Sequence, residues 1–477
     1  MQILYIVLKI ALMIAFTLNL GAILTWADRR QSAMIQDRIG PNRAVIKIGK
    51  TGKYDLRLWG LLHPLADGIK FIFKEDFRPP RADKLLFGIA PILAVASVLT
   101  VLAVIPFGDS LCLEGLTKAG ILAENCIHDA EKGKFPIAMT VAPLSSGLLY
   151  VFAVSGMGII AAAMAGASSD NKFSLMSALR AASQMVSYEV TLGMSLIGAF
   201  MMYGAVRPDV MVRWQSENVW GIFVQPFGFL LFFAAAVAET KRVPFDLPEA
   251  ESELVSGYFT EYSGMKFGMF YLGEYMEVVT SSMLIVTIFL GGWAIPFLQR
   301  DGLHISFGDT NIIRQVGDML TARMPDNETV KAMVANGVAP IQHWAVVLLG
   351  VLAFFGKVVI TCFVQTFVRW SLPRFRYDQL MRLCWKVLLP ASLANILLAG
   401  LVYQILKEAG YIGEVTHPTV KLLADLTKWV VAIGVPVIVI RGIVGFARSK
   451  KREFWKVGSS SDFADRTGGT PVESMQA

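Results

Sequence analysis

Nine apolar runs of membrane-spanning length divide the chain. An α-helix needs about 20 apolar residues to cross the hydrocarbon core of a bilayer. The first run, residues 3–26, is too long for the core of a signal peptide and lacks a small-residue cleavage site. The others lie near residues 85–106, 137–165, 183–203, 219–239, 265–296, 342–368, 383–405 and 427–446. The pattern predicts an all-α, polytopic transmembrane helix bundle of about nine membrane helices.

An additional helix is expected in the polar segment between the first two runs. Within residues 56–73 the apolar side chains recur at the spacing of one helical face, with charged side chains between them. Pro64 would kink this helix or begin a second one. The spacing predicts an amphipathic helix that lies at the membrane surface. The alternative is a packed surface helix of a small soluble loop domain.

Composition and charge agree with a membrane protein and suggest its orientation. Of the 477 residues, 55% are hydrophobic and only 17% are charged, whereas soluble domains have about 25% charged residues. The formal net charge is +7, and the Lys and Arg residues are unevenly distributed among the loops. The richer set contains residues 28–84, 166–182, 239–263, 369–382 and the tail after 446. The positive-inside rule places this set in the cytoplasm, with the N-terminus outside and the C-terminus inside.

The four cysteines and five histidines form no metal or redox motif. There is no Cys-x-x-Cys pair and no His-x-x-x-His spacing, so we expect no metal site and no redox centre in this chain. Cys112 and Cys126 share a loop that is expected outside, where a disulfide can persist. Two free thiols are the alternative for this pair.

Carboxylates in or beside the apolar runs are the candidate chemistry. Acids at membrane depth are costly and usually mark ion or proton pathways. Three further glutamates alternate in the loop after the fifth run, where a solvated acidic loop is the alternative. For the others the alternative is pairing with a nearby base such as Arg180 or Arg242. The candidates are Glu189, Glu239, Glu249, Glu251, Glu253 and Glu274.

Four separated segments resemble those of one known family. They are the first polar loop, with Gln36-Asp-Arg-Ile-Gly-Pro-Asn42 and Leu62-His-Pro-Leu-Ala-Asp-Gly-Ile-Lys70, then residues 178–190, 239–257 and 373–381. Together they resemble the membrane subunit of respiratory complex I that holds the quinone chamber. This is the H-type membrane subunit of the bacterial NADH:quinone oxidoreductase, which corresponds to subunit 1 of the mitochondrial enzyme. The resemblance extends from about residue 20 to 400.

The resemblance implies a role in coupling redox chemistry to proton translocation. In the family, this subunit joins the peripheral arm, which carries flavin and iron–sulfur clusters, to the proton-pumping membrane arm and its small subunits. A quinone such as ubiquinone is the substrate, enters from the bilayer, and is reduced at the junction with two peripheral subunits. The six glutamates would form the proton path. The residues that would bind quinone or brace the chamber are Arg29, His63, Asp67, Arg180, Arg242, Phe245 and Asp246.

The resemblance also implies a location and a division of the chain. It implies a multi-pass protein of the bacterial cytoplasmic (inner) membrane, with no nucleic-acid partner. Residues 1–405 would form the family-type domain, with the quinone tunnel and the acidic loop. Residues 406–477 would add a ninth membrane helix and a basic cytoplasmic tail.

The chain departs from the family pattern at several positions. Asp28 stands where Glu is usual, His63 stands where Gln is frequent, and residues 44–55 and 297–341 look longer than in common members. Glu277 is not part of the pattern and is therefore left out of the predicted proton path. Two alternative functions remain at this point. The first is the homologous membrane subunit of a membrane-bound hydrogenase, which reduces no quinone. The second is a free-standing ion transporter, against which the lack of a visible inverted repeat argues.

Overall fold

The apolar runs form helices that are long enough to cross a membrane. In the described part of this computed structural model, seven helices meet that length and apolarity, and one apolar helix is shorter. The long ones are α1 (Gln2–Ile35), α3 (Lys84–Val101), α5 (Gly147–Ser168), α6 (Lys172–Tyr203), α11 (Gly264–Phe289), α13 (His343–Ser371) and a continuous run from α14 (Tyr377–Leu383) through η3 (Cys384–Leu388) to α15 (Leu389–Glu408). The predicted all-α, polytopic architecture is confirmed.

The structure describes most of the chain. The described residues are 2–44, 46–48, 54–56, 58–112, 136–248, 255–299, 302–307, 310–316, 319–321, 343–408, 422, 425–437 and 440–441. The chain forms two compact units, Met1–Lys428 and Trp429–Ala477. The described residues of the second unit, 429–437 and 440–441, are helical. Cys126 and the side chain of Cys112 lie outside the described part, so the predicted disulfide remains a prediction.

Polar caps and prolines set the helix ends. The Asn171 side chain accepts a hydrogen bond from the Phe173 amide at 3.0 Å and thereby caps the start of α6. At its other end α6 stops at Gly204, whose φ of +64° suits glycine. The apolar run near 219–239 is interrupted before Pro226, which lacks the amide that an unbroken helix needs. It therefore forms α8 (Gly221–Val224) and then α9 (Pro226–Glu239).

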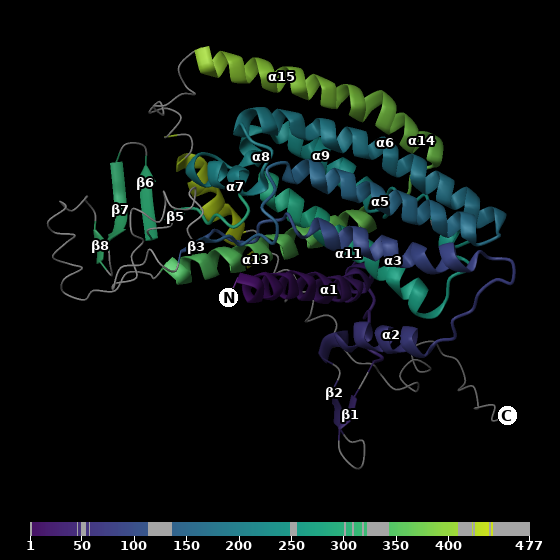
Figure 1. The fold of residues 1–477 in the computed structure, drawn as a ribbon. Helices are drawn as coiled ribbons and strands as arrows, with labels where there is room; N and C mark the ends of the chain where they lie inside the picture. Colours follow the sequence, from purple (N-terminus) through teal and green to yellow (C-terminus); the bar gives the residue numbers. More distant parts are fainter. Residues whose placement is uncertain are drawn as a thin grey trace, which may run out of the picture. The chain divides into compact units, whose positions relative to one another are not determined.

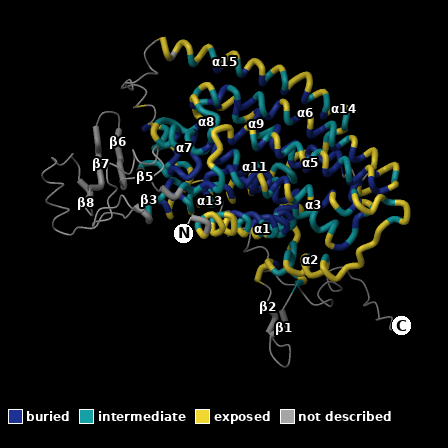
Figure 2. Tube along the Cα trace, in the orientation of Figure 1, coloured by how far each residue is buried: buried dark blue, intermediate teal, exposed yellow. Residues whose placement is uncertain are grey.

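Helix α11 is the centre of the first unit. Its most apolar stretch is 83% buried, far more than any other membrane-length helix. Helices α1, α3 and α13 pack directly against it, and α15 lies along α6 at the edge of the bundle (Figure 1). Figure 2 shows the same order as burial: α11 is mostly buried, whereas α15 has a strongly exposed face. Side chains on α11 are therefore surrounded by protein.

The amphipathic helix is shorter than its pattern suggested. Helix α2 (Leu62–Phe73) begins after a 3-10 turn, η1 (Leu58–Gly60), so the predicted start at Leu56 is wrong. Leu56 instead ends β2 (Tyr54–Leu56), which pairs antiparallel with β1 (Ile46–Ile48). Pro64 falls in the first turn of α2, where a proline is tolerated. No α2 residue is buried, and the described part of the chain leaves several of its apolar side chains exposed, among them Phe73 at 84% exposure.

Short elements join the long helices at positions where the sequence pattern predicted none. Helix α7 (Pro208–Glu217) occupies the loop between α6 and α8. Helix α5 begins ten residues later than the apolar run near 137, because residues 136–137 form β4, paired with β3 (Leu111–Cys112). The long segment after α11 contributes a four-stranded antiparallel sheet. Its strands are β5 (Leu298–Gln299), β6 (Gly302–Phe307), β7 (Thr310–Val316) and β8 (Met319–Thr321).

A partly buried lysine holds the end of the central helix. Lys357 of α13 donates three hydrogen bonds, to the carbonyls of Leu290, Gly292 and Ala294 at 2.9, 2.9 and 2.7 Å. Its ammonium also lies 4.3 Å from the centre of the Trp220 ring. These carbonyls belong to the turn that follows α11 and have no further helix to bond with.

Replacing this lysine tests its structural role. We expect Lys357→Met to lower the melting temperature of the purified protein, because each buried carbonyl left without a donor costs about 1–3 kcal/mol. Lys407→Met, at an exposed position near the end of α15, is the matched control. Equal melting temperatures for the two variants would contradict this role.

Candidate functional site

A buried carboxylate joins three membrane helices and the loop after α9. Asp28 of α1 is 5% exposed. It accepts hydrogen bonds from Trp370 Nε1 at 2.6 Å, from the Tyr275 hydroxyl at 2.9 Å and from the Arg369 guanidinium. An Arg242 nitrogen lies 3.9 Å from the same carboxylate. A buried charge needs such partners to offset the cost of leaving water.

Arg242 occupies the space between two carboxylates. Its guanidinium lies 3.8 Å from a Glu274 oxygen, in addition to its contact with Asp28, and its central carbon is 3.6 Å from the centre of the Tyr275 ring. Burial alone would lower the pKa of this guanidinium, but Tyr275, Glu274 and Asp28 raise it above its ordinary value. Arg242 is therefore a permanent buried cation. Glu274 is paired with Arg242, which agrees with the alternative that this acid pairs with a nearby base.

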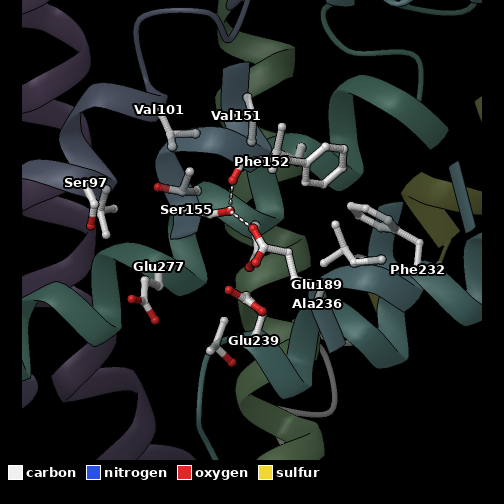
Figure 3. A pocket seen from close by; sticks show the side chains of 16 residues that line it. Ser97, Val101, Val151, Phe152, Ser155, Glu189, Phe232, Ala236, Glu239 and Glu277 are labelled. Carbon is white, nitrogen blue, oxygen red and sulfur yellow. Dashed lines mark hydrogen bonds between the residues drawn. The ribbon is translucent and has the colours of Figure 1, made fainter. Parts of the chain in front are cut away.

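The other predicted membrane acids line a cavity. Glu189 accepts a hydrogen bond from Ser155 Oγ at 3.0 Å, and Glu239 and Glu277 face the same space (Figure 3). The cavity is large enough for several water molecules. One oxygen of Glu239 and one of Glu277 are buried without a hydrogen-bond partner among the described residues. The cavity therefore combines apolar walls with unsatisfied carboxylate oxygens.

Lys241 connects the loop to this cavity. Its backbone adopts a left-handed φ of +54°, which is uncommon for a residue with a side chain. Its buried ammonium lies 3.1 Å from the second Glu277 oxygen. Burial would lower the pKa of this ammonium, but the Glu277 and Glu274 carboxylates raise it above its ordinary value. Lys241 therefore remains charged beside the cavity.

A second pocket lies between α2, α11 and the loop that precedes α11. Its volume is about 380 Å³, within the size range of small-molecule sites. Arg29 and Asp67 form an ion pair of 2.6 Å on its wall, and Phe71, Phe259 and Tyr271 are among the rings that line it. The pocket combines an aromatic lining with one charged pair.

Tyrosine hydroxyls link this pocket to the buried network. Tyr271 lies on the pocket wall, and its hydroxyl is 3.2 Å from that of Tyr275. Tyr275 in turn donates to Asp28. Continuous hydrogen bonds therefore run from the pocket to the carboxylate that faces Arg242.

Comparison with known proteins agrees with the sequence motifs. A family model described as NADH dehydrogenase matches residues 8–400. The chain belongs to the NADH dehydrogenase family. The membership predicted from the four motif segments is confirmed.

Curated members of the family cover most of the chain. They are named as H-type subunits of NADH-quinone oxidoreductase. The one from Cytophaga hutchinsonii is 39% identical over 79% of this chain and 90% of its own length. The one from Flavobacterium psychrophilum is 38% identical over 82% of this chain and 95% of its own length. The one from Thermomicrobium roseum is 39% identical over 81% and 92%, respectively.

The residues predicted from the family pattern fall into separate groups in the structure. Arg29 and Asp67 share the pocket, whereas His63 bonds locally, with its Nδ1 3.1 Å from the Gly60 carbonyl oxygen. Arg242 lies in the buried network. Glu249, Glu251 and Glu253 lie outside the described residues, so their predicted role remains untested.

The last three predicted chamber residues all contact the segment that leads from the end of α13 to the start of α14. Asp246 accepts a hydrogen bond from Arg374 at 2.8 Å. The Phe245 ring stacks on Phe375 with a centroid distance of 5.7 Å. Arg180 lies over the Tyr377 ring, 6.0 Å from its centre. All three partners come from residues 374–377, so this segment is held against the loop after α9 by Asp246 and Phe245 and against α6 by Arg180.

Several residues of this arrangement were missed by sequence reasoning. Asp28 was noted only as a departure from the family pattern. Lys241, Arg369 and Arg374 were used only in the count of basic residues in the loops. Glu277 was left out of the predicted path. Its spacing of three residues from Glu274 was the available signal, because residues three apart share a helix face.

The buried network allows a direct test. We expect Asp28→Asn to lower thermal stability and the amount of assembled protein. The variant leaves Arg242 and Arg369 with less compensating charge, and breaking a buried ion pair costs about 3–5 kcal/mol. The matched control is Asp37→Asn, because Asp37 is exposed. If Asp28→Asn is as stable as the control, the network does not hold these elements together.

Proposed function

We propose that this chain is the quinone-chamber subunit of a proton-pumping NADH:quinone oxidoreductase, as the names of its relatives suggest. The observation that carries the proposal is the hydrogen-bonded connection from the pocket at Tyr271 through Tyr275 to the buried carboxylate of Asp28. A quinone takes up protons together with electrons when it is reduced, so its site needs a route to proton donors. The pocket and its link to Asp28 provide the physical elements of such a route.

The pocket suits a quinone headgroup with an apolar tail. The uncovered apolar side chains of α2 would contact lipid, so a tail could enter beside this helix. Within the pocket, the Arg29 guanidinium can donate hydrogen bonds to a quinone oxygen, while Asp67 holds it in place at 2.6 Å. The aromatic rings of Phe71, Phe259 and Tyr271 would cover the faces of the headgroup.

Electrons and further sites would come from partner subunits. The proposal assigns flavin and iron–sulfur clusters to the peripheral arm, with NADH as the electron donor. The partners would be the peripheral subunits that complete the quinone site and the small neighbouring membrane subunits. The chain would lie in the bacterial cytoplasmic membrane with α2 on the cytoplasmic side, as the distribution of Lys and Arg favours.

The carboxylates near the cavity would carry the coupling. Glu189, Glu239 and Glu274 belong to this proposed path, together with the loop residues Glu249, Glu251 and Glu253. A carboxylate in an apolar wall is costly to leave charged and unpaired, so it responds when a neighbour changes charge. We also propose the division into a family-type domain, 1–405, and a C-terminal extension, 406–477, because the family match ends at residue 400.

The role of the acids is tested by amide substitution. We expect Glu239→Gln to assemble and to lose most quinone reductase activity together with proton pumping. Glu274→Gln should lose the same activities, with less assembled protein, because it also removes a carboxylate that is paired with Arg242. Glutamine keeps the size but cannot carry a proton, and a positioned acid–base group accelerates proton transfer by about 100-fold or more. Deamino-NADH oxidation and a pH-gradient dye in membrane vesicles measure the two activities.

Two controls complete this experiment. Reduction of a hydrophilic acceptor at the flavin reports assembly, and Glu217→Gln alters an exposed glutamate of α7. Wild-type turnover and gradient in both path variants would refute the proton-path assignment. Identification of the subunits that co-purify with the chain separates this function from that of a hydrogenase component.

The pocket is tested by filling it. Thr260 is exposed and lines the pocket, so Thr260→Trp should raise the KM for quinone or abolish quinone reduction. Thr260→Ser keeps the side chain small and should behave like the wild type. Activity with the hydrophilic acceptor should survive in both variants. Unchanged quinone kinetics in Thr260→Trp would show that quinone does not use this pocket.

A further inference from the structure

Glu277 stands at the junction of two cavities. One is the space that it shares with Glu189 and Glu239. The other is a smaller cavity that it shares with Glu274 and Lys241. Among the path acids that the structure describes, Glu274 lines only the smaller cavity, and Glu189 and Glu239 line only the larger one. Glu277 is thus the described carboxylate that faces both sides.

The two oxygens of Glu277 have different surroundings. One lies 3.1 Å from the Lys241 ammonium. The other is buried and has no hydrogen-bond partner in the described part of the protein. A buried acceptor left without a donor is costly. A water molecule in the adjoining cavity could donate a hydrogen bond to that oxygen, or accept one from it when the carboxyl is protonated. Both arrangements are components of a proton relay.

Glu239 presents the same feature to the same cavity. One of its carboxylate oxygens is also buried without a partner among the described residues. Figure 3 shows Glu239, Glu277 and Glu189 around the shared space, with Glu189 held by Ser155. The cavity therefore brings the unsatisfied oxygens of two carboxylates to one place.

We propose that Glu277 is the proton-carrying link between Glu274 and Glu239, and that Lys241 is the positioning residue that holds it. The inference rests on the proposed function. A proton leaves the Glu274 carboxyl, is taken up by Glu277, and passes through water in the larger cavity to Glu239. No electron moves in this step, and the Lys241 ammonium keeps its charge throughout. Arg242 stays beside Glu274 and favours its ionised form after the proton has left.

The first test is Glu277→Gln in the assembled complex. It should retain flavin-site activity and lose quinone reductase activity and pumping by about 100-fold or more, as expected when a proton-transfer group is removed. Glu217→Gln, on exposed α7, is the matched control. Wild-type turnover in Glu277→Gln overturns the proposal.

A neutral double variant separates proton transfer from simple charge balance. Lys241→Met with Glu277→Gln removes both charges and leaves no unpaired lysine. If Glu277 only balances Lys241, the double variant recovers the activity that the single variant lost, and the proposal is overturned. If Glu277 carries protons, the double variant assembles and remains inactive.

A third variant decides the case in which neither of these assembles. Glu277→Asp keeps an acid that can pair with Lys241 but shortens its reach into the cavity. Reduced turnover with intact flavin-site activity supports the proposal, and unchanged turnover overturns it. Glu239→Gln, measured in parallel, distinguishes failure of the proposed proton-path function from failure of the role proposed for Glu277. If it is fully active, the proton-path function itself is lost. If it is inactive while Glu277→Gln is active, only the role of Glu277 is lost.

Discussion

The buried charge of Arg242 is the constraint on which the rest of the site depends. Removing a guanidinium from water is expensive, and its cost is offset only by good partners in the protein. Those partners are Asp28 of α1, Glu274 of α11 and the face of the Tyr275 ring. Because they come from two membrane helices, the loop that carries Arg242 must lie against both. Arg369 adds a further cation from α13 to Asp28, so a third helix is held by the same carboxylate.

This constraint also explains how two adjacent cations serve two carboxylates. The left-handed backbone at Lys241 separates its side chain from that of Arg242. Arg242 then meets Glu274, and Lys241 meets Glu277, one turn further along α11. Tyr271 stands one turn before Glu274 and Tyr275, on the pocket wall. A single helix thus presents the pocket, the buried network and the cavity in succession. Its deep burial shields the network and the cavity from bulk solvent, whereas the pocket opens to the surface at exposed residues such as Thr260.

The sequence predicted the long helices because each apolar run is many residues long and needs no knowledge of its neighbours. The sequence pattern did not predict the short elements or the start of α2, which depend on local backbone geometry. The start of α2 was misplaced because Leu58 and Trp59 take positive φ values, which an apolar pattern does not reveal. Helix α7 and the strands after α11 are too short to leave a periodic signal.

The candidate site was predicted in part for a similar reason. The resemblance identified Glu189, Glu239 and Glu274, which lie in or at the end of apolar helices. It left out Glu277 because that position is not part of the family pattern. The ion pair that positions Glu277 joins it to Lys241, which is 36 positions away in the sequence. Only the fold brings the two residues together. A carboxylate cannot be assigned as free or paired until its tertiary partners are known.

The loop that follows α9 also connects the two ends of the proposed mechanism. Its first residues, Lys241 and Arg242, hold the carboxylates of α11, and its later residues, Phe259 and Thr260, line the pocket. A bound molecule can shift a conformational equilibrium only by the difference in its affinity for the two states. A quinone that binds better to one arrangement of Phe259 and Thr260 would therefore favour one arrangement of the ion pairs. Linkage requires the reverse effect as well, so the protonation state of the carboxylates would alter quinone affinity by the same factor.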